Sequence, residues 1–183
     1  VVEMLFRSGK DDVAAYAIER RLAHPPGTYW SYASGTSNIV ARIAGDAAGG
    51  GGEDDMRAFL RERLFATRGL QSTARDFARF GLLYLRDGVW DGARLLPAGW
   101  VDHARSETPA SIGRYGAHWW LALDGSGIFT ANGFLGQHIV VDPLRDLVVV
   151  RLGVSTPAQR IAVSHGLRSI TRAFPAHDGT ELR

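Results

Sequence analysis

Apolar residues recur every three or four positions through the first part of the sequence, which is the spacing of one face of an α-helix. Pro25-Pro26-Gly27 and the four glycines at 49–52 interrupt the pattern and mark breaks between helices. The clearest helix begins at Thr73-Ala74-Arg75-Asp76, which resembles a capping box with Asp in place of Glu. The expected elements are a helix over 11–23 capped by Asp11 or Asp12, an extended piece over 28–32, and helices from Ser34 or Thr36, over 53–65, from Thr73 and over 97–105.

The pattern changes after Tyr115, where short apolar segments between turn residues are typical of strands. Asp124-Gly125-Ser126-Gly127 predicts a hairpin turn. The run Leu147–Val150 is apolar on both faces, which predicts a central strand. The expected strands cover 118–123, 128–131, 137–141 and 147–152. A last helix is expected from Thr156-Pro157 to about Phe174, packed on the sheet through Val163, Leu167, Ile170 and Phe174.

Helices followed by antiparallel strands and a covering helix define the α+β class. The 183 residues are enough for one domain with a hydrophobic core. We therefore expect a single domain over 1–183, with a helical part at about 11–110 and antiparallel strands plus a C-terminal helix at about 115–175.

Composition narrows the class of protein. Hydrophobic residues make up 45% and charged residues 22%, as in ordinary soluble domains, and no apolar run reaches the roughly 18 residues of a membrane span. The isoelectric point of about 9.3 suggests a basic nucleic-acid binder, but the net charge is only +2 and the arginines are scattered. We therefore favour a solvated surface, because nucleic-acid binding would need a clustered arginine face.

Cysteine is absent, which excludes disulfides, thiol catalysis and cysteine metal sites. The six histidines are scattered without a His-x-His or His-x-x-x-His pair, so no metal site is predicted. No signal segment is visible and the first residue is Val1, which leaves bacterial cytoplasm, periplasm and secretion open. The oligomeric state is open as well.

Tyr32-Ala33-Ser34 is the first candidate for chemistry. A tyrosine near a nucleophilic serine can accept its proton if neighbouring cations stabilise the phenolate, because a free tyrosine titrates near pH 10. On spacing alone, a packed aromatic residue before a helix-capping serine is the favoured explanation of the triplet.

The second candidate is the segment Asn132–Gln137, which contains Gly133, Phe134 and Gly136 and lies between two expected strands. A strand edge there offers backbone N–H groups to an oxyanion, and glycines allow close approach of a substrate. A glycine-rich turn with no chemical role is the alternative.

A third group consists of aromatic residues that could line an apolar substrate cleft. Packing in the core is the alternative, and we expect it for at least half of them. The members are Trp30, Tyr115, Trp119, Trp120 and Phe134.

Several phrases, in this order, resemble the later portion of serine β-lactamase-type hydrolases. That superfamily includes class C β-lactamases, D,D-peptidases, esterases and the 6-aminohexanoate-dimer (nylon oligomer) hydrolases. Ser34 and Gly136-Gln137 are closest to the nylon hydrolase branch, and the absence of a Lys or His before Gly133 favours an esterase or amide hydrolase over a β-lactamase. The phrases are Pro25–Gly35, Gly69–Leu85, Tyr115–Trp120 and Gly133–Gln137 followed by Val141-Asp142-Pro143.

The resemblance implies the C-terminal portion of a β-lactamase-like fold and acyl transfer to small ester or amide substrates, with no metal or organic cofactor. It implies Tyr32 as general acid/base and Ser34 as its supporting group. It also places Tyr115, Trp119, Trp120 and the Gly133-Phe134-Leu135-Gly136 segment at the substrate or oxyanion site, whereas Ser72–Asp76 is expected to be structural.

The nucleophile of this superfamily lies in Ser-x-x-Lys. The chain has one lysine, Lys10, and Arg7 stands three residues before it, so the motif is absent. We therefore expect a fragment that is inactive alone, and the close spacing of Leu64-Phe65-Ala66 and Gly69 suggests that a loop near 66–69 is missing. The alternative is a non-catalytic module that binds peptidoglycan-like or acylated ligands.

Overall fold

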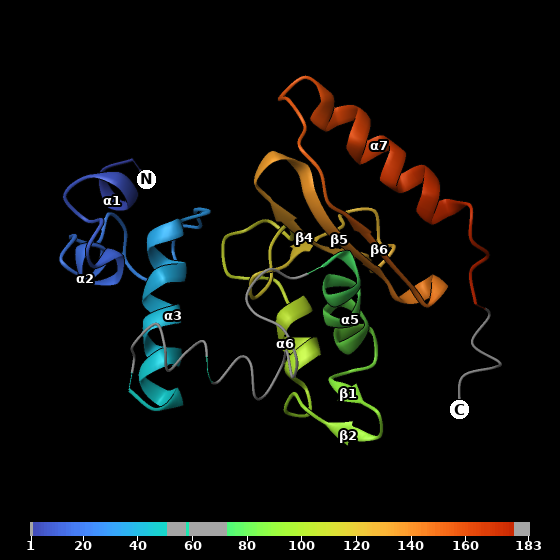
Figure 1. Cartoon of the computed structure of the whole chain (residues 1–183), viewed down its shortest axis with the longest axis horizontal. Helices are drawn as coiled ribbons and strands as arrows, with labels where there is room; N and C mark the ends of the chain where they lie inside the picture. The colour runs from blue at the N-terminus through green and yellow to red at the C-terminus, as the bar shows by residue number, and fades with distance from the viewer. Residues whose placement is uncertain (1, 51–57, 59–72, 178–183) are drawn as a thin grey trace. The chain divides into compact units, whose positions relative to one another are not determined.

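The computed structural model describes residues 2–50, 58 and 73–177, in two compact units that divide between residues 71 and 72 (Figure 1). This division falls inside the expected helical part. Each unit is described by itself. The helix expected over 53–65, apart from Ala58, and the proposed gap near 66–69 lie outside the described residues.

The first unit contains helices α1 (Val2–Phe6), α2 (Val13–Ile18) and α3 (Ser34–Ala48). Asp12 caps α2, because its Oδ1 accepts a hydrogen bond from the Ala15 N–H at 2.8 Å. Its second oxygen accepts from Arg42 of α3 at 3.0 Å, so one carboxylate joins the two helices. Helix α2 ends five residues earlier than expected, and 28–32 forms no strand.

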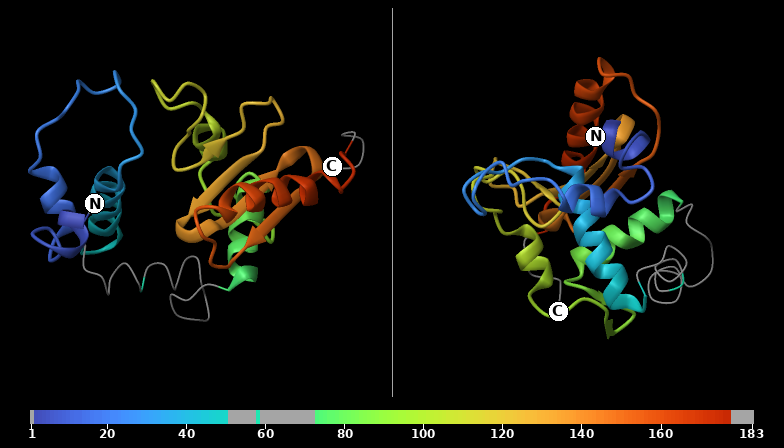
Figure 2. Two further views of the ribbon diagram at one scale, coloured as in Figure 1. Left: turned by 90° about the horizontal axis from the view of Figure 1, so that it is seen from above. Right: turned by 90° about the vertical axis from the view of Figure 1, so that its left-hand side faces the viewer.

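The second unit is built on a four-stranded antiparallel sheet in the order β3-β4-β5-β6, a simple meander (Figure 2). Its strands are β3 (Trp120–Leu121), β4 (Phe129–Gly133), β5 (Gln137–Asp142) and β6 (Leu147–Arg151), and a separate hairpin pairs β1 (Val89–Trp90) with β2 (Ala93–Arg94). The α+β class is confirmed. Among the described helices, none is long and apolar enough to cross a membrane.

Helix α5 (Ala74–Leu85) packs on one face of this sheet. The expected capping box is present: the Asp76 N–H donates to the Thr73 hydroxyl at 3.3 Å, and the Thr73 N–H donates to the Asp76 carboxylate at 2.9 Å. Gly81 lets α5 approach the sheet closely, since a Cβ at this position would stand 2.6 Å from Val148 Cγ1. The core on this side contains Phe77, Phe80, Tyr84, Trp119, Phe129, Ile139 and Val141.

Helix α7 (Gln159–Arg172) contacts β6 and η1 (Phe134–Gly136), and the cavity it shares with the sheet is lined by the even-numbered residues of β4 and β5. These side chains point away from α5, because successive strand residues alternate between faces. Leu167 and Thr171 are the buried residues of α7, whereas Ile170 and Phe174 are about half exposed. The expected helix is therefore present, but the last two of its four expected packing residues are wrong.

The expectation of a central strand at 147–150 is also wrong within the described sheet. Strand β6 stands at the end of the strand order, and all five of its residues are half-buried. Strand β5 is interior and carries the continuous buried run from Ile139 to Asp142. Helix α6 (Trp100–Arg105) begins three residues after Pro97, because Gly99 before it adopts the left-handed φ of 78°.

Candidate functional site

The Gly133–Gly136 segment is a tight connection between β4 and β5. Leu135 and Gly136 have φ values of 59° and 85°, which place both in the left-handed region. A Cβ at Gly136 would stand 3.1 Å from Arg151 Nη1, and one at Gly133 would stand 2.9 Å from Gln137 Cβ. Close approach therefore favours glycine at both positions, and the left-handed conformation favours it at Gly136 as well.

Side chains from β5 and β6 hold this segment in place. The Gln137 amide exchanges two hydrogen bonds of 2.9 Å with the backbone of Gly153. The Arg151 guanidinium donates to the carbonyl oxygen of Gly136, to that of Gly153 at 3.0 Å and to the Ser155 hydroxyl at 2.7 Å. The Ser155 N–H donates to the Leu135 carbonyl at 2.9 Å, which completes a brace on both sides of the turn.

The end of β4 has a free backbone edge within the described sheet. Strand β3 pairs with β4 only at Phe129 and Thr130. The Ala122 N–H donates to the Ile128 carbonyl at 3.0 Å, so the even residues of β4 turn their backbone groups toward β3. The N–H and C=O of Asn132 therefore point past the end of β3, where His118, at a φ of 65°, does not continue the strand. Such an edge can donate to an oxyanion.

Asn132 directly precedes Gly133 at the end of β4. Its side-chain oxygen lies 2.8 Å from His138 Nδ1 across the β4–β5 ladder. Burial and, secondarily, the charge of Arg151 lower the pKa of His138 below its usual value. Asn132 thus places a neutral amide beside Gly133, and the lowered pKa of His138 makes this neighbour harder to protonate.

The two tryptophans of the candidate site have different environments. Trp119 is 2% exposed, and its ring lies 4.9 Å from Phe129 and 4.8 Å from Tyr84 in the core. Trp120 lines the opposite face of the sheet, and its ring makes an edge contact of 5.0 Å with Tyr115. Core packing therefore accounts for Trp119, as the alternative interpretation expects, whereas Trp120 and Tyr115 stay partly accessible.

Phe134 is the most accessible of the candidate aromatic residues, with 80% of its surface exposed. It lies between Gly133 and the left-handed Leu135 in the braced connection. Its backbone is therefore held in place while its ring is exposed to solvent.

Tyr32 and Ser34 lie in the first unit. Tyr32 is 59% exposed in the loop before α3, and Ser34 is the first residue of α3, with Ala33 at the capping position. The Gly133–Gly136 segment, Tyr115 and Trp120 lie in the second unit. The residues of the second unit therefore lie together along one sheet. Tyr32 and Ser34 belong to the first unit.

Sequence reasoning missed Arg151 and Ser155. The position of Arg151 at the end of an apolar strand could have identified it, because a partly buried charge needs hydrogen-bonding partners in or near the sheet. Among the described residues, no group of three or more acidic, histidine or cysteine side chains could hold a metal ion.

Comparison with known proteins identifies the family of the chain. Residues 51–162 match the Beta-lactamase family, and the chain belongs to that family. The chain is 29% identical over 195 residues to 6-aminohexanoate-dimer hydrolase of Paenarthrobacter ureafaciens, which spans 95% of this chain and 46% of that protein.

Two solved structures share the fold. A Bacillus anthracis protein provisionally named 6-aminohexanoate-dimer hydrolase superposes with a TM-score of 0.66 at 26% identity, covering 86% of this chain and 47% of that one. A Bacteroides dorei protein provisionally named β-lactamase superposes with a TM-score of 0.68 at 15% identity, covering 88% and 64%. The chain thus spans about half the length of the hydrolase relatives that it matches.

Proposed function

We propose that this chain is the part of a serine hydrolase that carries the substrate-binding edge and the general acid/base tyrosine, and that the complete enzyme cleaves carboxylic ester or short amide bonds through an acyl-enzyme. The braced Gly133–Gly136 segment beside the free edge of β4 carries the proposal. The assignment to an amide or ester hydrolase is supported by the relative that bears the name 6-aminohexanoate-dimer hydrolase.

In this proposal the serine of a Ser-x-x-Lys motif, outside the 183 residues, attacks the substrate carbonyl. Its proton passes by way of the lysine and Tyr32 to the leaving alcohol or amine, and water then releases the acyl group as a carboxylate. Ser34 supports Tyr32 by hydrogen bonding. Backbone N–H groups at the end of β4 and in the Gly133–Gly136 turn stabilise the oxyanion.

Asn132 bears on the substrate class. A cation before Gly133 would attract a carboxylate on the substrate. The neutral amide of Asn132, which contacts His138, does not attract one. We therefore propose neutral or short-chain esters and amides rather than β-lactams. Phe134, Trp120 and Tyr115 would supply apolar contacts to the acyl or leaving group.

The chain by itself is proposed to be inactive, because its only lysine, Lys10, follows Arg7 by three positions and Ser-x-x-Lys is absent from the 183 residues. Incubation with a fluorophosphonate probe is expected to leave the purified chain unlabelled. Labelling of a serine in this polypeptide, by displacement of fluoride to give a phosphonate ester, would show that a nucleophile is active without the motif and would overturn the proposed inactivity.

The coding sequence upstream of Val1 provides the second test. An in-frame Ser-x-x-Lys is expected, and the longer protein should hydrolyse p-nitrophenyl esters, with Tyr32→Phe lowering kcat at least about a hundredfold. The matched control is Tyr29→Phe, since Tyr29 is an exposed tyrosine of the same loop. Equal loss in both variants would remove the role of Tyr32.

A gene product without Ser-x-x-Lys would favour the second candidate function, a non-catalytic module that binds peptidoglycan-like or acylated ligands. The absence of the motif from these 183 residues is the observation on its side. Calorimetric titration with an N-acylated dipeptide would then show saturable binding with the ligand recovered intact.

A further inference from the structure

A row of three side chains crosses the sheet beside the Gly133–Gly136 turn. Asn132 of β4 pairs with His138 of β5, and His138 pairs in turn with Arg151 of β6. Residues directly opposite each other on antiparallel strands have Cβ atoms about 4.5–5.5 Å apart on the same face. His138 therefore lies between a neutral amide and a guanidinium. We call these three residues the cross-strand row.

The contact with Asn132 determines which ring nitrogen of His138 can take up a proton. Asn132 Oδ1 lies 2.8 Å from His138 Nδ1. An amide oxygen only accepts hydrogen bonds, so Nδ1 carries the hydrogen of the neutral ring and Nε2 is the atom that takes up a proton. Protonation therefore adds a positive charge to the row and leaves the bond to Asn132 in place.

The third member of the row braces the turn. Arg151 donates to the carbonyls of Gly136 and Gly153 and to the Ser155 hydroxyl. These acceptors are neutral, and within the described part of the chain no carboxylate makes an ion pair with Arg151. A positive charge on His138 would therefore act on Arg151 uncompensated. Like charges opposite each other on neighbouring strands repel, so this charge opposes the position in which Arg151 holds the turn.

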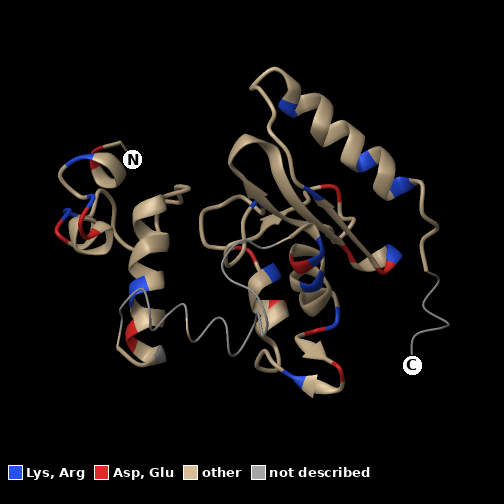
Figure 3. Cartoon of the chain, viewed as in Figure 1, with Lys and Arg blue, Asp and Glu red and all other residues tan. Residues whose placement is uncertain are grey.

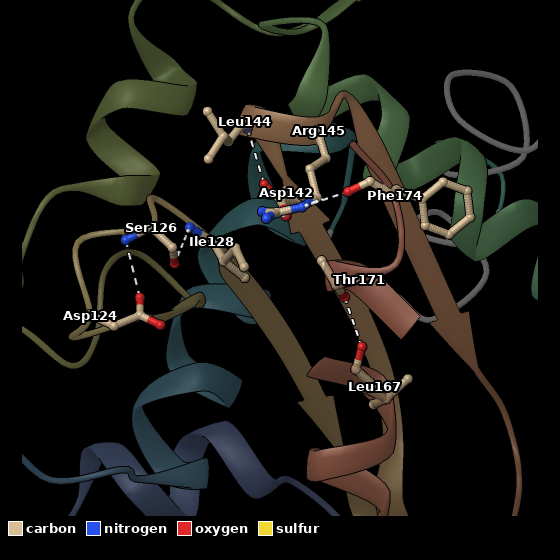
Figure 4. Close-up of polar contacts among 9 residues, drawn as sticks. All are labelled: Asp124, Ser126, Ile128, Asp142, Leu144, Arg145, Leu167, Thr171 and Phe174. Carbon is tan, nitrogen blue, oxygen red and sulfur yellow. Dashed lines mark hydrogen bonds and ion pairs between the residues drawn. The ribbon is translucent and has the colours of Figure 1, made fainter. Parts of the chain in front are cut away.

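Other charged groups line the same cavity as His138, from the β3–β4 connection, η2 (Pro143–Arg145) and α7. Asp124 accepts from the Ser126 N–H at 3.1 Å, and Arg145 donates to Asp142 at 3.0 Å, so both are already engaged (Figure 4). The charged positions along α7 are all basic, as Figure 3 shows in blue, and offer no counter-charge to a protonated histidine. The charged side chains that line the cavity are Asp124, Arg145, Arg168 and Arg172.

These surroundings favour the neutral form of His138. Burial and, secondarily, the charge of Arg151 lower the pKa of His138 below its usual value of about 6.5. Among the described charged groups, Arg151 is the one that contributes to this shift. Protonation of His138 therefore needs a more acidic pH than an exposed histidine needs, and it places the new charge opposite Arg151.

We infer that His138 is a pH-dependent switch for the Gly133–Gly136 turn: Arg151 braces the turn while His138 is neutral, and repulsion from protonated His138 releases it. The meaning of this switch for oxyanion stabilisation rests on the proposed function. The release of the turn itself can be measured in the 183-residue chain without any enzymatic activity, so the two can fail separately.

Amide hydrogen exchange of the 183-residue chain tests the inference. The Ser155 N–H donates to the Leu135 carbonyl inside the turn, so its protection reports on the brace. Between about pH 7.5 and about pH 5, which lies above the titration of ordinary carboxylates, this protection relative to the intrinsic exchange rate should fall. We expect a fall of at least about fourfold, the change that two like charges about 5 Å apart produce at the dielectric constant of water.

An amide outside the turn provides the internal reference. The Leu95 N–H donates to the Gly88 carbonyl at 2.8 Å in the β1–β2 hairpin. Its protection should change little over the same pH range, because a small two-stranded hairpin exchanges by local opening. An equal fall at Leu95 and Ser155 would overturn the inference, since the pH would then act on the whole unit.

Substitutions at position 138 separate charge from shape. His138→Gln removes the titrating group and keeps a side chain that can donate to Asn132, so Ser155 protection should stay constant over the pH range. His138→Lys is charged at both pH values and should show the low protection at about pH 7.5 as well. His103→Gln is the matched control, since His103 lies on α6 outside the row, and it should behave as the wild-type chain does.

Constant protection of Ser155 in the wild-type chain, or the same fall in His138→Gln, would overturn the inference. A longer, hydrolytic protein separates it from the proposed function. Release of the turn there, with ester hydrolysis equal in wild type and His138→Gln at both pH values, would keep the switch and count against the oxyanion role of the turn.

Discussion

Arg151 at the end of β6 donates a hydrogen bond to the carbonyl oxygen of Gly136, fifteen positions earlier in the sequence. One guanidinium therefore joins the last residue of the sheet to the turn that contains the candidate oxyanion site. The same group reaches Gly153 and Ser155, so it links two connections that the β5–β6 hairpin alone would leave independent.

We expect Arg151→Ala to loosen the Gly133–Gly136 turn without unfolding the sheet. Three partly buried acceptors lose one donor each, although the Gly153 carbonyl keeps the bond from Gln137, and the cost is about 1–3 kcal/mol in unfolding free energy. Native-state hydrogen exchange should show faster exchange of the Gly153 and Ser155 amides, whose acceptors belong to the same brace. Unchanged exchange at both amides, with the same variant less stable, would mean that Arg151 does not hold the turn.

Gly81 and Val148 provide a test of the packing between α5 and β6. Gly81→Ala places a methyl group 2.6 Å from Val148 Cγ1, so overpacking should lower the unfolding free energy by about 1–3 kcal/mol despite the better helix propensity of alanine. Adding Val148→Ala removes the clashing methyl. Urea unfolding should then give a double-variant loss at least about 1 kcal/mol smaller than the sum of the single losses. Strict additivity would contradict the close contact.

Asp142 is fully buried and relies on Arg145 for its counter-charge. Arg145→Ala should cost about 3 kcal/mol, because among the described residues it leaves the buried carboxylate with the Leu144 N–H at 3.1 Å as its remaining partner. Adding Asp142→Asn should recover part of this loss in urea unfolding. Arg79→Ala is the control, since its ion pair with Asp76 is exposed and screened by solvent. Equal losses in the two single variants would argue against a special role of burial.

His138 should make the stability of the second unit depend on pH. Burial and the charge of Arg151 lower its pKa in the folded state, whereas the unfolded chain takes up the proton at about 6.5. The unfolded state therefore binds more protons between these two values, and stability falls as the pH decreases below about 6.5, levelling off once the folded histidine is protonated.

Urea midpoints at about pH 7.5, 6.5 and 5.5 measure this dependence, in a range above the titration of ordinary carboxylates. His138→Gln should flatten the decrease, because glutamine does not titrate. A decrease of the same size in the variant would assign the pH dependence to other groups. His103→Gln is the control, since His103 lies on α6, away from the β4–β5 ladder.

The local signals in the sequence predicted the elements that depend on local chemistry. The Thr73–Asp76 capping box and the Asp124–Gly127 turn are set by hydrogen bonds within a few residues, and both are present. The packed face of α7 was predicted less well. Thr171 is buried because its hydroxyl donates to the carbonyl one turn earlier, so a polar residue takes the place expected for Ile170.

Properties that depend on distant contacts could not be predicted. The place of β6 in the sheet follows from strand order, which an apolar run does not encode. The brace of the candidate site depends on side-chain bonds from Arg151 to the Gly136 carbonyl and from Gln137 to the Gly153 carbonyl, which are 15 and 16 positions apart and leave no residue pattern. The opposite orientations of Trp119 and Trp120 were available in principle, because neighbouring strand residues alternate between faces.

The exposed ring of Phe134 has a consequence for how this surface can diverge. Its backbone is fixed by glycines, Arg151 and Gln137, while its side chain is 80% exposed. Exchange of this one side chain should therefore alter shape and polarity at the turn with little effect on folding. Substitutions at position 134, in nature or in a saturation library, can therefore change the surface of the turn while the braced backbone stays the same.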